Sequence, residues 1–118
     1  MTPTRLAPCL CILLLAAALP AAGAEQQASY QIVQRKVAPR APTLVVHQGD
    51  SVRINFTCDE AARLHLHGYD VLLALQPGRT GQMRVQADAL GRFPVAAHGF
   101  GSGHQHEVTL IYLEVQPK

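Results

Sequence analysis

Short stretches in which apolar and polar residues alternate run through most of the chain, and they constrain its fold more than any other feature. The clearest covers residues 51–57, where Val52, Ile54 and Phe56 alternate with polar neighbours. A period of two is typical of a strand with one buried face. Glycine and proline cluster between the stretches, and no helical stripe occurs beyond the N-terminal segment. The pattern therefore predicts an all-β fold.

Eight segments are predicted to be strands, and the residues before them, 25–29, are expected to be a short disordered lead. The predicted strands cover residues 30–37, 43–47, 51–57, 63–67, 71–75, 82–87, 93–97 and 107–115. Strands this short, at this spacing, favour a small β-sandwich or barrel of about seven to eight strands.

The N-terminal segment has the composition of a secretory signal peptide. Arg5 precedes an apolar run over residues 9–19, and small residues stand at Ala22 and Ala24, before the expected cleavage point. The run is shorter than the roughly 20 apolar residues of a membrane span. We therefore expect cleavage after Ala24 and one domain over 25–118, periplasmic or secreted, with no membrane span after cleavage. A retained N-terminal anchor is the alternative.

Charge and cysteine content exclude some classes of protein. The formal net charge is +2 without a basic run, so nothing indicates binding to nucleic acid or anionic lipid. Cys58 is the one cysteine of three beyond the predicted signal peptide, so no intramolecular disulfide is expected. It continues the apolar parity of strand 51–57, which predicts a buried thiol.

Five of the six histidines fall in two short regions. They are His65 and His67 in strand 63–67, and His98, His104 and His106 around a glycine-rich loop. Side chains two apart on a strand point the same way, so the first two can reach one ion. Imidazole suits copper, zinc or nickel. These five residues are the candidate metal ligands.

Other interpretations of these residues stay open. A His-x-His pair on a strand is often only solvated or hydrogen-bonded, and histidines in a polar loop need bind nothing. His47 is interpreted as structural. Met83 shares the parity of Val85 and is interpreted first as core, with a sulfur ligand for Cu(I) as the alternative. Asp70 is a candidate partner for a histidine ring from outside the ligand set.

The chain resembles the cupredoxin family, whose members are small exported β-sandwiches that often bind copper. The resemblance lies in "VVHQGDSVRINFT", "LHLHGYD", "LQPGRTGQMRV", "GRFPVAAHGFGSGHQH" and "VTLIYLEVQP". It implies a Greek-key sandwich and is greatest to divergent, non-blue cupredoxin-like domains of exported bacterial proteins.

One departure from the family pattern changes the implied function. Ala97 stands where blue-copper members have their cysteine ligand, and no methionine follows to act as an axial ligand. A blue-copper centre needs a thiolate with two histidines. The resemblance therefore implies a periplasmic copper carrier or buffer that holds Cu(II) in a histidine-rich site, not a blue-copper electron carrier and not an enzyme.

Two alternatives come from other classes. The first is a metal-free cupredoxin-like interaction module, whose partner would be another exported or membrane protein. The second is a cupin-like metalloenzyme, suggested by the His-x-His and Pro-Gly elements. No glutamate follows His67 at the spacing that a cupin needs, and Asp70 is the nearest carboxylate.

Overall fold

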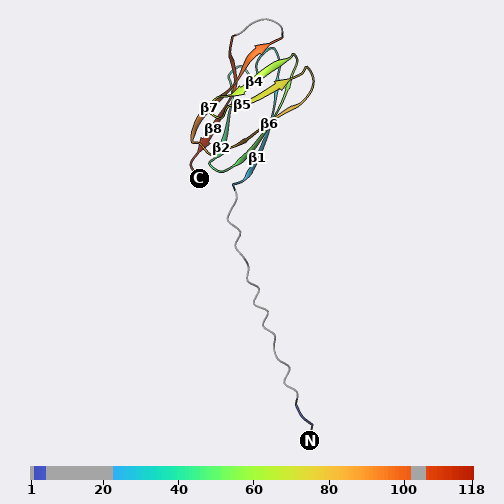
Figure 1. Ribbon diagram of the computed structural model, residues 1–118, viewed down its shortest axis with the longest axis vertical. Helices are drawn as coiled ribbons and strands as arrows, with labels where there is room; N and C mark the ends of the chain where they lie inside the picture. Colours follow the sequence, from blue (N-terminus) through green and yellow to red (C-terminus); the bar gives the residue numbers. More distant parts are fainter. Residues whose placement is uncertain (1, 5–22, 102–105) are drawn as a thin grey trace.

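The computed structural model of the protein describes residues 2–4, 23–101 and 106–118. Within these residues every regular element is a strand (Figure 1). The strands are β1 (Glu25–Ile32), β2 (Thr43–His47), β3 (Ser51–Cys58), β4 (Ala62–Leu66), β5 (Val71–Leu75), β6 (Gly81–Gln86), β7 (Gly91–Phe100) and β8 (Val108–Gln116).

The strands form two sheets. One has the order β1-β3-β6, and the other has the order β2-β8-β7-β4-β5. The β1–β3 and β2–β8 pairs are parallel, whereas the other pairs are antiparallel. The predicted all-β sandwich is confirmed.

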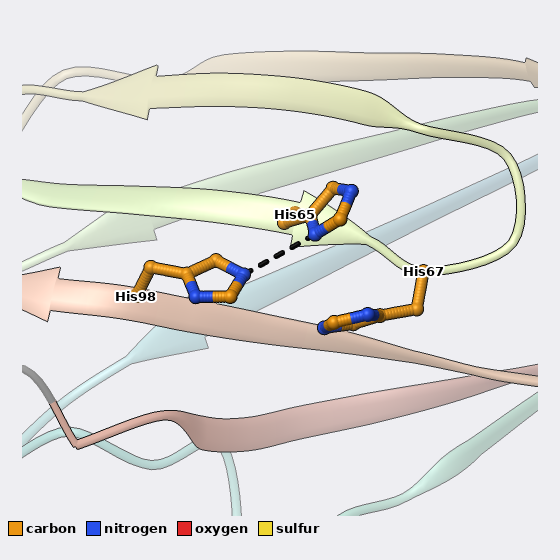
Figure 2. A group of neighbouring side chains, drawn as sticks. All are labelled: His65, His67 and His98. Carbon is orange, nitrogen blue, oxygen red and sulfur yellow. Dashed lines mark hydrogen bonds between the residues drawn. The ribbon is translucent and has the colours of Figure 1, made fainter.

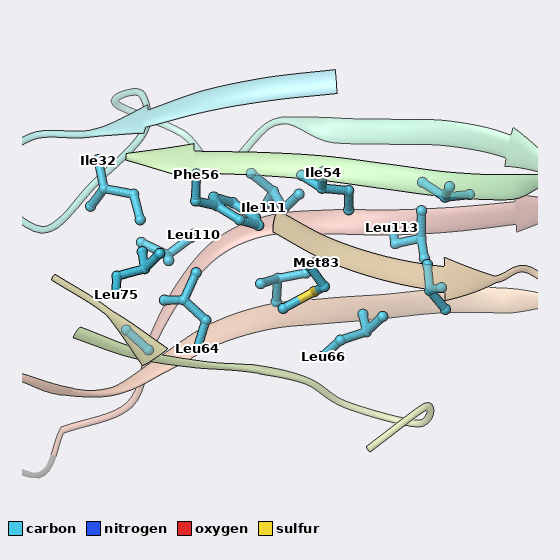
Figure 3. Close-up of a cluster of buried hydrophobic side chains, with 14 of the residues drawn as sticks. Ile32, Ile54, Phe56, Leu64, Leu66, Leu75, Met83, Leu110, Ile111 and Leu113 are labelled. Carbon is cyan, nitrogen blue, oxygen red and sulfur yellow. The ribbon is translucent and has the colours of Figure 1, made fainter. Parts of the chain in front are cut away.

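Alternating side chains of both sheets form a single core (Figure 3). On β3 the apolar parity is buried, as the alternation predicts, and on β4 Leu64 and Leu66 are buried while Arg63 is exposed. Met83 of β6 is 1% exposed and belongs to this core, as its parity predicts. Burying one such large apolar side chain stabilises the fold by about 1.5–3 kcal/mol. The core therefore determines which side of each strand faces outward.

The disordered lead predicted for residues 25–29 is wrong. These residues belong to β1, which pairs with β3 from Glu25 opposite Ser51 to Ile32 opposite Cys58. Apolar residues are sparse at the start of β1, so the sequence lacks the alternation that marks the other strands. Backbone hydrogen bonds to β3, the central strand of its sheet, hold the start of β1 in place where few apolar side chains are buried.

The strand predicted over residues 30–37 ends early for a backbone reason. Gln34 and Arg35 have φ of 51° and 65°, which is left-handed and incompatible with a strand. The Gln34 N–H donates to Asp59 Oδ2 at 3.1 Å, and Arg35 Nε pairs with Glu60 Oε1 at 3.1 Å. These contacts hold a tight turn against the end of β3.

Cys58 ends β3 and is 2% exposed, which confirms the prediction of a buried thiol. Burial raises its pKa, and the nearby Asp59 and Glu60 carboxylates act in the same direction. The thiol is therefore protonated at neutral pH and is a poor metal ligand.

Two leucines provide a matched test of this burial pattern. Leu113 of β8 is fully buried, whereas Leu72 of β5 is 75% exposed. We expect Leu113→Ala to lower the free energy of unfolding by about 2–5 kcal/mol, because it leaves a cavity in the core. Leu72→Ala should change it by less than about 0.5 kcal/mol. Urea denaturation measures both values, and equal losses would contradict the packing.

Candidate metal centre

The pairing of β4 with β7 brings two histidines to one face of the five-stranded sheet. His65 stands between Leu64 and Leu66, which point into the core, so its side chain points outward. Directly opposite His65 on β7 is Ala96. Ala96 is buried yet lies outside the core cluster, so it forms a small-residue floor on the histidine face.

A β-bulge in β7 positions His98. Arg63 pairs with Gly99, but the next residue, Leu64, pairs with Ala97, which leaves His98 as an extra residue without a partner on β4. A bulge of this kind re-aims the side chain of the inserted residue. His98 directly follows the strand predicted over residues 93–97, but it lies inside β7, which continues to Phe100. His98 therefore lies between two residues, Ala97 and Gly99, that both pair with β4.

The turn after β4 positions His67. The His67 N–H donates to the Pro94 carbonyl at 3.0 Å, which ties the start of the turn to β7. Gly68 follows with φ of +87°, and a Cβ at this position would lie 2.5 Å from Phe93 Cδ1. Only glycine fits there without moving the ring.

Tyr69 fastens the same turn to the loop before β7. Its hydroxyl donates to the Ala89 carbonyl at 2.8 Å and accepts from the Ala89 N–H at 3.0 Å. Its ring meets that of Phe93 edge-on, with centroids 4.9 Å apart. The turn that carries His67 is thus anchored on two sides.

These elements bring His65, His67 and His98 together (Figure 2). One ring nitrogen of each lies within 4.8 Å of the others, and His65 Nδ1 is 3.2 Å from His98 Nε2. The centroid of the His65 ring is 4.4 Å from that of His67 and 5.3 Å from that of His98. Two imidazole nitrogens bound at 2.0–2.1 Å to one tetrahedral ion lie roughly 3.3 Å apart. The three rings therefore need only small rotations to hold one metal ion.

Two carboxylates flank the three rings. Asp70 Oδ1 is 3.6 Å from His65 Nε2, and Glu107, just before β8, contacts His67 Nε2. At 3.6 Å the Asp70 contact is electrostatic rather than a hydrogen bond. Because Nε2 of His65 faces Asp70, Nδ1 is the nitrogen that faces His98 and would bind the ion. Ligating histidines commonly donate their other ring N–H to a carboxylate, and Asp70 lies on that side of His65, beyond hydrogen-bond distance.

One of the two remaining predicted ligands lies within the described residues, and it stands apart from this group. His106 is exposed and lies outside the three-residue group, and His104 lies outside the described residues. His47 ends β2 on an exposed position, where its N–H donates to Asp50 Oδ2 at 2.9 Å.

Glu107 was missed by sequence reasoning. It is separated by 40 residues from His67, and no local pattern links the two.

Alanine occupies the part of β7 where the family pattern has a thiolate. Ala97 pairs with Leu64 and packs in the core, while Ala96 lies opposite His65. β7 therefore presents a methyl group to the core at Ala97 and a methyl group to the histidine face at Ala96. Cys58, the cysteine within the described chain, ends β3 in the other sheet.

Comparisons with known proteins identify structural neighbours but no sequence relatives. No protein-family model matches the chain, and no curated protein matches it. Similar solved structures include a heme-copper terminal oxidase dimer, with a TM-score of 0.57 and 24% identity over 74% of this chain and 60% of that chain. At this identity the likeness establishes the fold alone.

Two further neighbours are copper oxidases. A blue copper oxidase from Nitrosomonas europaea matches with a TM-score of 0.56 and 18% identity, over 80% of this chain and 39% of its own. A multicopper oxidase, mgLAC, matches with a TM-score of 0.58 and 17% identity, over 80% and 40%. The chain thus spans less than two thirds of the length of each of these neighbours. Over the part of the chain described, no helix is long and apolar enough to cross a membrane.

Gly68 and Gly78 provide a matched test of how the His67 turn is held. Both have positive φ, but a Cβ at Gly78 would meet nothing within 4 Å. Gly78→Ala should therefore lower the free energy of unfolding by about 1–2 kcal/mol, the cost of placing an alanine in the left-handed backbone region. We expect Gly68→Ala to cost more and to shift the ring proton resonances of His67, because Phe93 must move. Equal losses of stability and an unchanged His67 spectrum would show that Phe93 does not restrict the turn.

Proposed function

The chain has a cupredoxin-like fold, and from this premise we propose that it binds one copper ion through His65, His67 and His98. The ion is held as Cu(II), and the protein acts as a copper carrier or buffer outside the cytoplasm. The observation that carries the proposal is the convergence of three imidazoles from β4, the turn after it and the bulge in β7.

The chemistry of the donors supports copper in its higher oxidation state. Among divalent first-row metals, nitrogen ligands generally bind Cu²⁺ most tightly. The group contains three imidazoles and no sulfur, whereas sulfur ligands select Cu(I). Asp70 and Glu107 add negative charge beside His65 and His67, which favours a dication over a monocation. The neighbours named as copper oxidases agree with this choice of metal.

Glu107 has a positioning role in this proposal. It directly precedes β8, the strand beside β7, and its carboxylate contacts His67 Nε2. It thereby ties the turn after β4 to a third strand and restricts rotation of the His67 ring. A held ring loses less freedom when the ion binds, which raises the affinity of the site.

Exposure of the site supports a carrier or buffer. The His65 and His67 side chains are 20% and 35% exposed, so the ion would lie at the protein surface. An ion with three protein ligands keeps a position open toward solvent, and a receiving protein can enter there by ligand exchange. The same open position is what an oxidase would use, and the enzymatic alternative rests on it.

The proposal predicts one Cu(II) per chain with nitrogen hyperfine structure in the electron paramagnetic resonance spectrum. Changing an outer-shell partner of a metal ligand typically costs about 10–100-fold in affinity. We therefore expect at least about 100-fold weaker binding by His65→Ala/His67→Ala and by His98→Ala, measured by competition with a copper chelator. Copper should also raise the melting temperature of the unsubstituted protein.

His47→Ala and His106→Ala serve as matched controls. Both remove an exposed histidine that lies outside the group of three, so both variants should bind copper as tightly as the unsubstituted protein. Full affinity in the double variant would refute the site. Absence of binding by the unsubstituted protein would favour the metal-free interaction module. Turnover of an oxidase substrate by the copper-loaded protein would favour an enzyme.

A further inference from the structure

Asp50 is the one charged side chain that the described part of the chain buries, with 4% exposure. It lies in the turn between β2 and β3. Its Oδ2 accepts the His47 N–H at 2.9 Å, and its Oδ1 accepts the Ala24 N–H at 3.1 Å. Both donors are backbone amides, which carry no net charge.

No basic side chain compensates this carboxylate within the described residues. The ion pairs there join Arg35 to Glu60, Arg53 to Glu25 and two histidines to other carboxylates. A charge removed from water is costly unless an opposite charge meets it. The atom that touches Asp50 Oδ1 is the nitrogen of Ala24, which becomes an ammonium if the chain begins at that residue.

Residue 24 also belongs to the folded structure. The Ser51 N–H donates to the Ala24 carbonyl at 3.0 Å, which extends the β1–β3 pairing by one residue. Removal of Ala24 would eliminate this bond together with the contact to Asp50. Gly23 lies against the β2–β3 turn and has no room for a side chain, because a Cβ there would lie 2.0 Å from the Gly49 carbonyl oxygen.

The sequence offers two positions for signal-peptide cleavage. Signal peptidases require small residues at the first and third positions before the cut. A cut after Ala24 has Ala24 and Ala22 at these positions, and a cut one residue earlier has Gly23 and Ala21. Most of the predicted signal peptide lies outside the described residues, but Ala24 lies within them. Its contacts therefore distinguish the two possible cuts.

We propose that the exported chain is cut between Gly23 and Ala24 and that the new α-ammonium group of Ala24 binds the buried carboxylate of Asp50. In the cut, a signal peptidase hydrolyses the peptide bond. Water supplies the oxygen of the new Gly23 carboxylate, and the Ala24 nitrogen leaves as an amine that is protonated at neutral pH. The proposal rests on the predicted signal peptide and is independent of copper binding.

The first test is the intact mass of the protein after export from a bacterial host that expresses the full chain. We expect a mass that begins at Ala24. A mass that begins at Glu25, or an uncut chain in the exported fraction, would overturn the proposal.

The second test separates the charge of the N-terminus from its backbone contacts. Chains that begin at Ala24 with a free amine, at Ala24 with an acetylated amine, and at Glu25 are compared by thermal melting. We expect the free amine to raise the melting temperature by at least about 4 °C over the acetylated chain, a shift that corresponds to about 1 kcal/mol in a domain of this size.

Asp50→Asn supplies the matched control. In that background the free and acetylated Ala24 chains should melt together, because the carboxylate is gone. Should Asp50→Asn fail to fold, the comparison of free and acetylated chains with Asp50 intact still decides. Equal melting temperatures for those two chains would overturn the ion pair.

Discussion

The antiparallel pairing of β4 with β7, interrupted by one extra residue at His98, is the interaction on which the candidate metal centre depends. Leu64 and Leu66 lock β4 into the core and thereby direct His65 outward. The bulge then inserts His98 into β7, where its Nε2 lies 3.2 Å from His65 Nδ1. Without the register shift the two strands would continue in regular pairing, and the residue after Ala97 would face Arg63.

The rest of the site is built by tying one turn to that pair of strands. Gly68 lets the chain turn sharply against Phe93, and Tyr69 hydrogen-bonds Ala89 in both directions. Glu107, just before β8, contacts the ring of His67. The three candidate rings are therefore restrained by the protein itself, as a preorganised metal site requires.

Much of the fold could be predicted from the sequence, because burial of one face leaves a period of two. The all-β sandwich predicted from this period is confirmed. The structural neighbours confirm the cupredoxin-like fold, which was expected from the sequence motifs. The alternation of Leu64 and Leu66 also predicted that His65 and His67 share a face, and their rings lie 4.4 Å apart. β1 was misplaced because its pairing rests on backbone hydrogen bonds, which leave no mark on residue type. Neither the bulge at His98 nor the Glu107 contact could be predicted, since each depends on the register between strands distant in sequence.

A crystal structure of the copper-loaded protein, with anomalous diffraction at the copper edge, would show whether His65, His67 and His98 hold one copper ion. We expect one anomalous peak about 2.0–2.1 Å from His65 Nδ1, His98 Nε2 and a ring nitrogen of His67. A peak at His104 or His106 alone, or no ordered copper at the three rings, would contradict it.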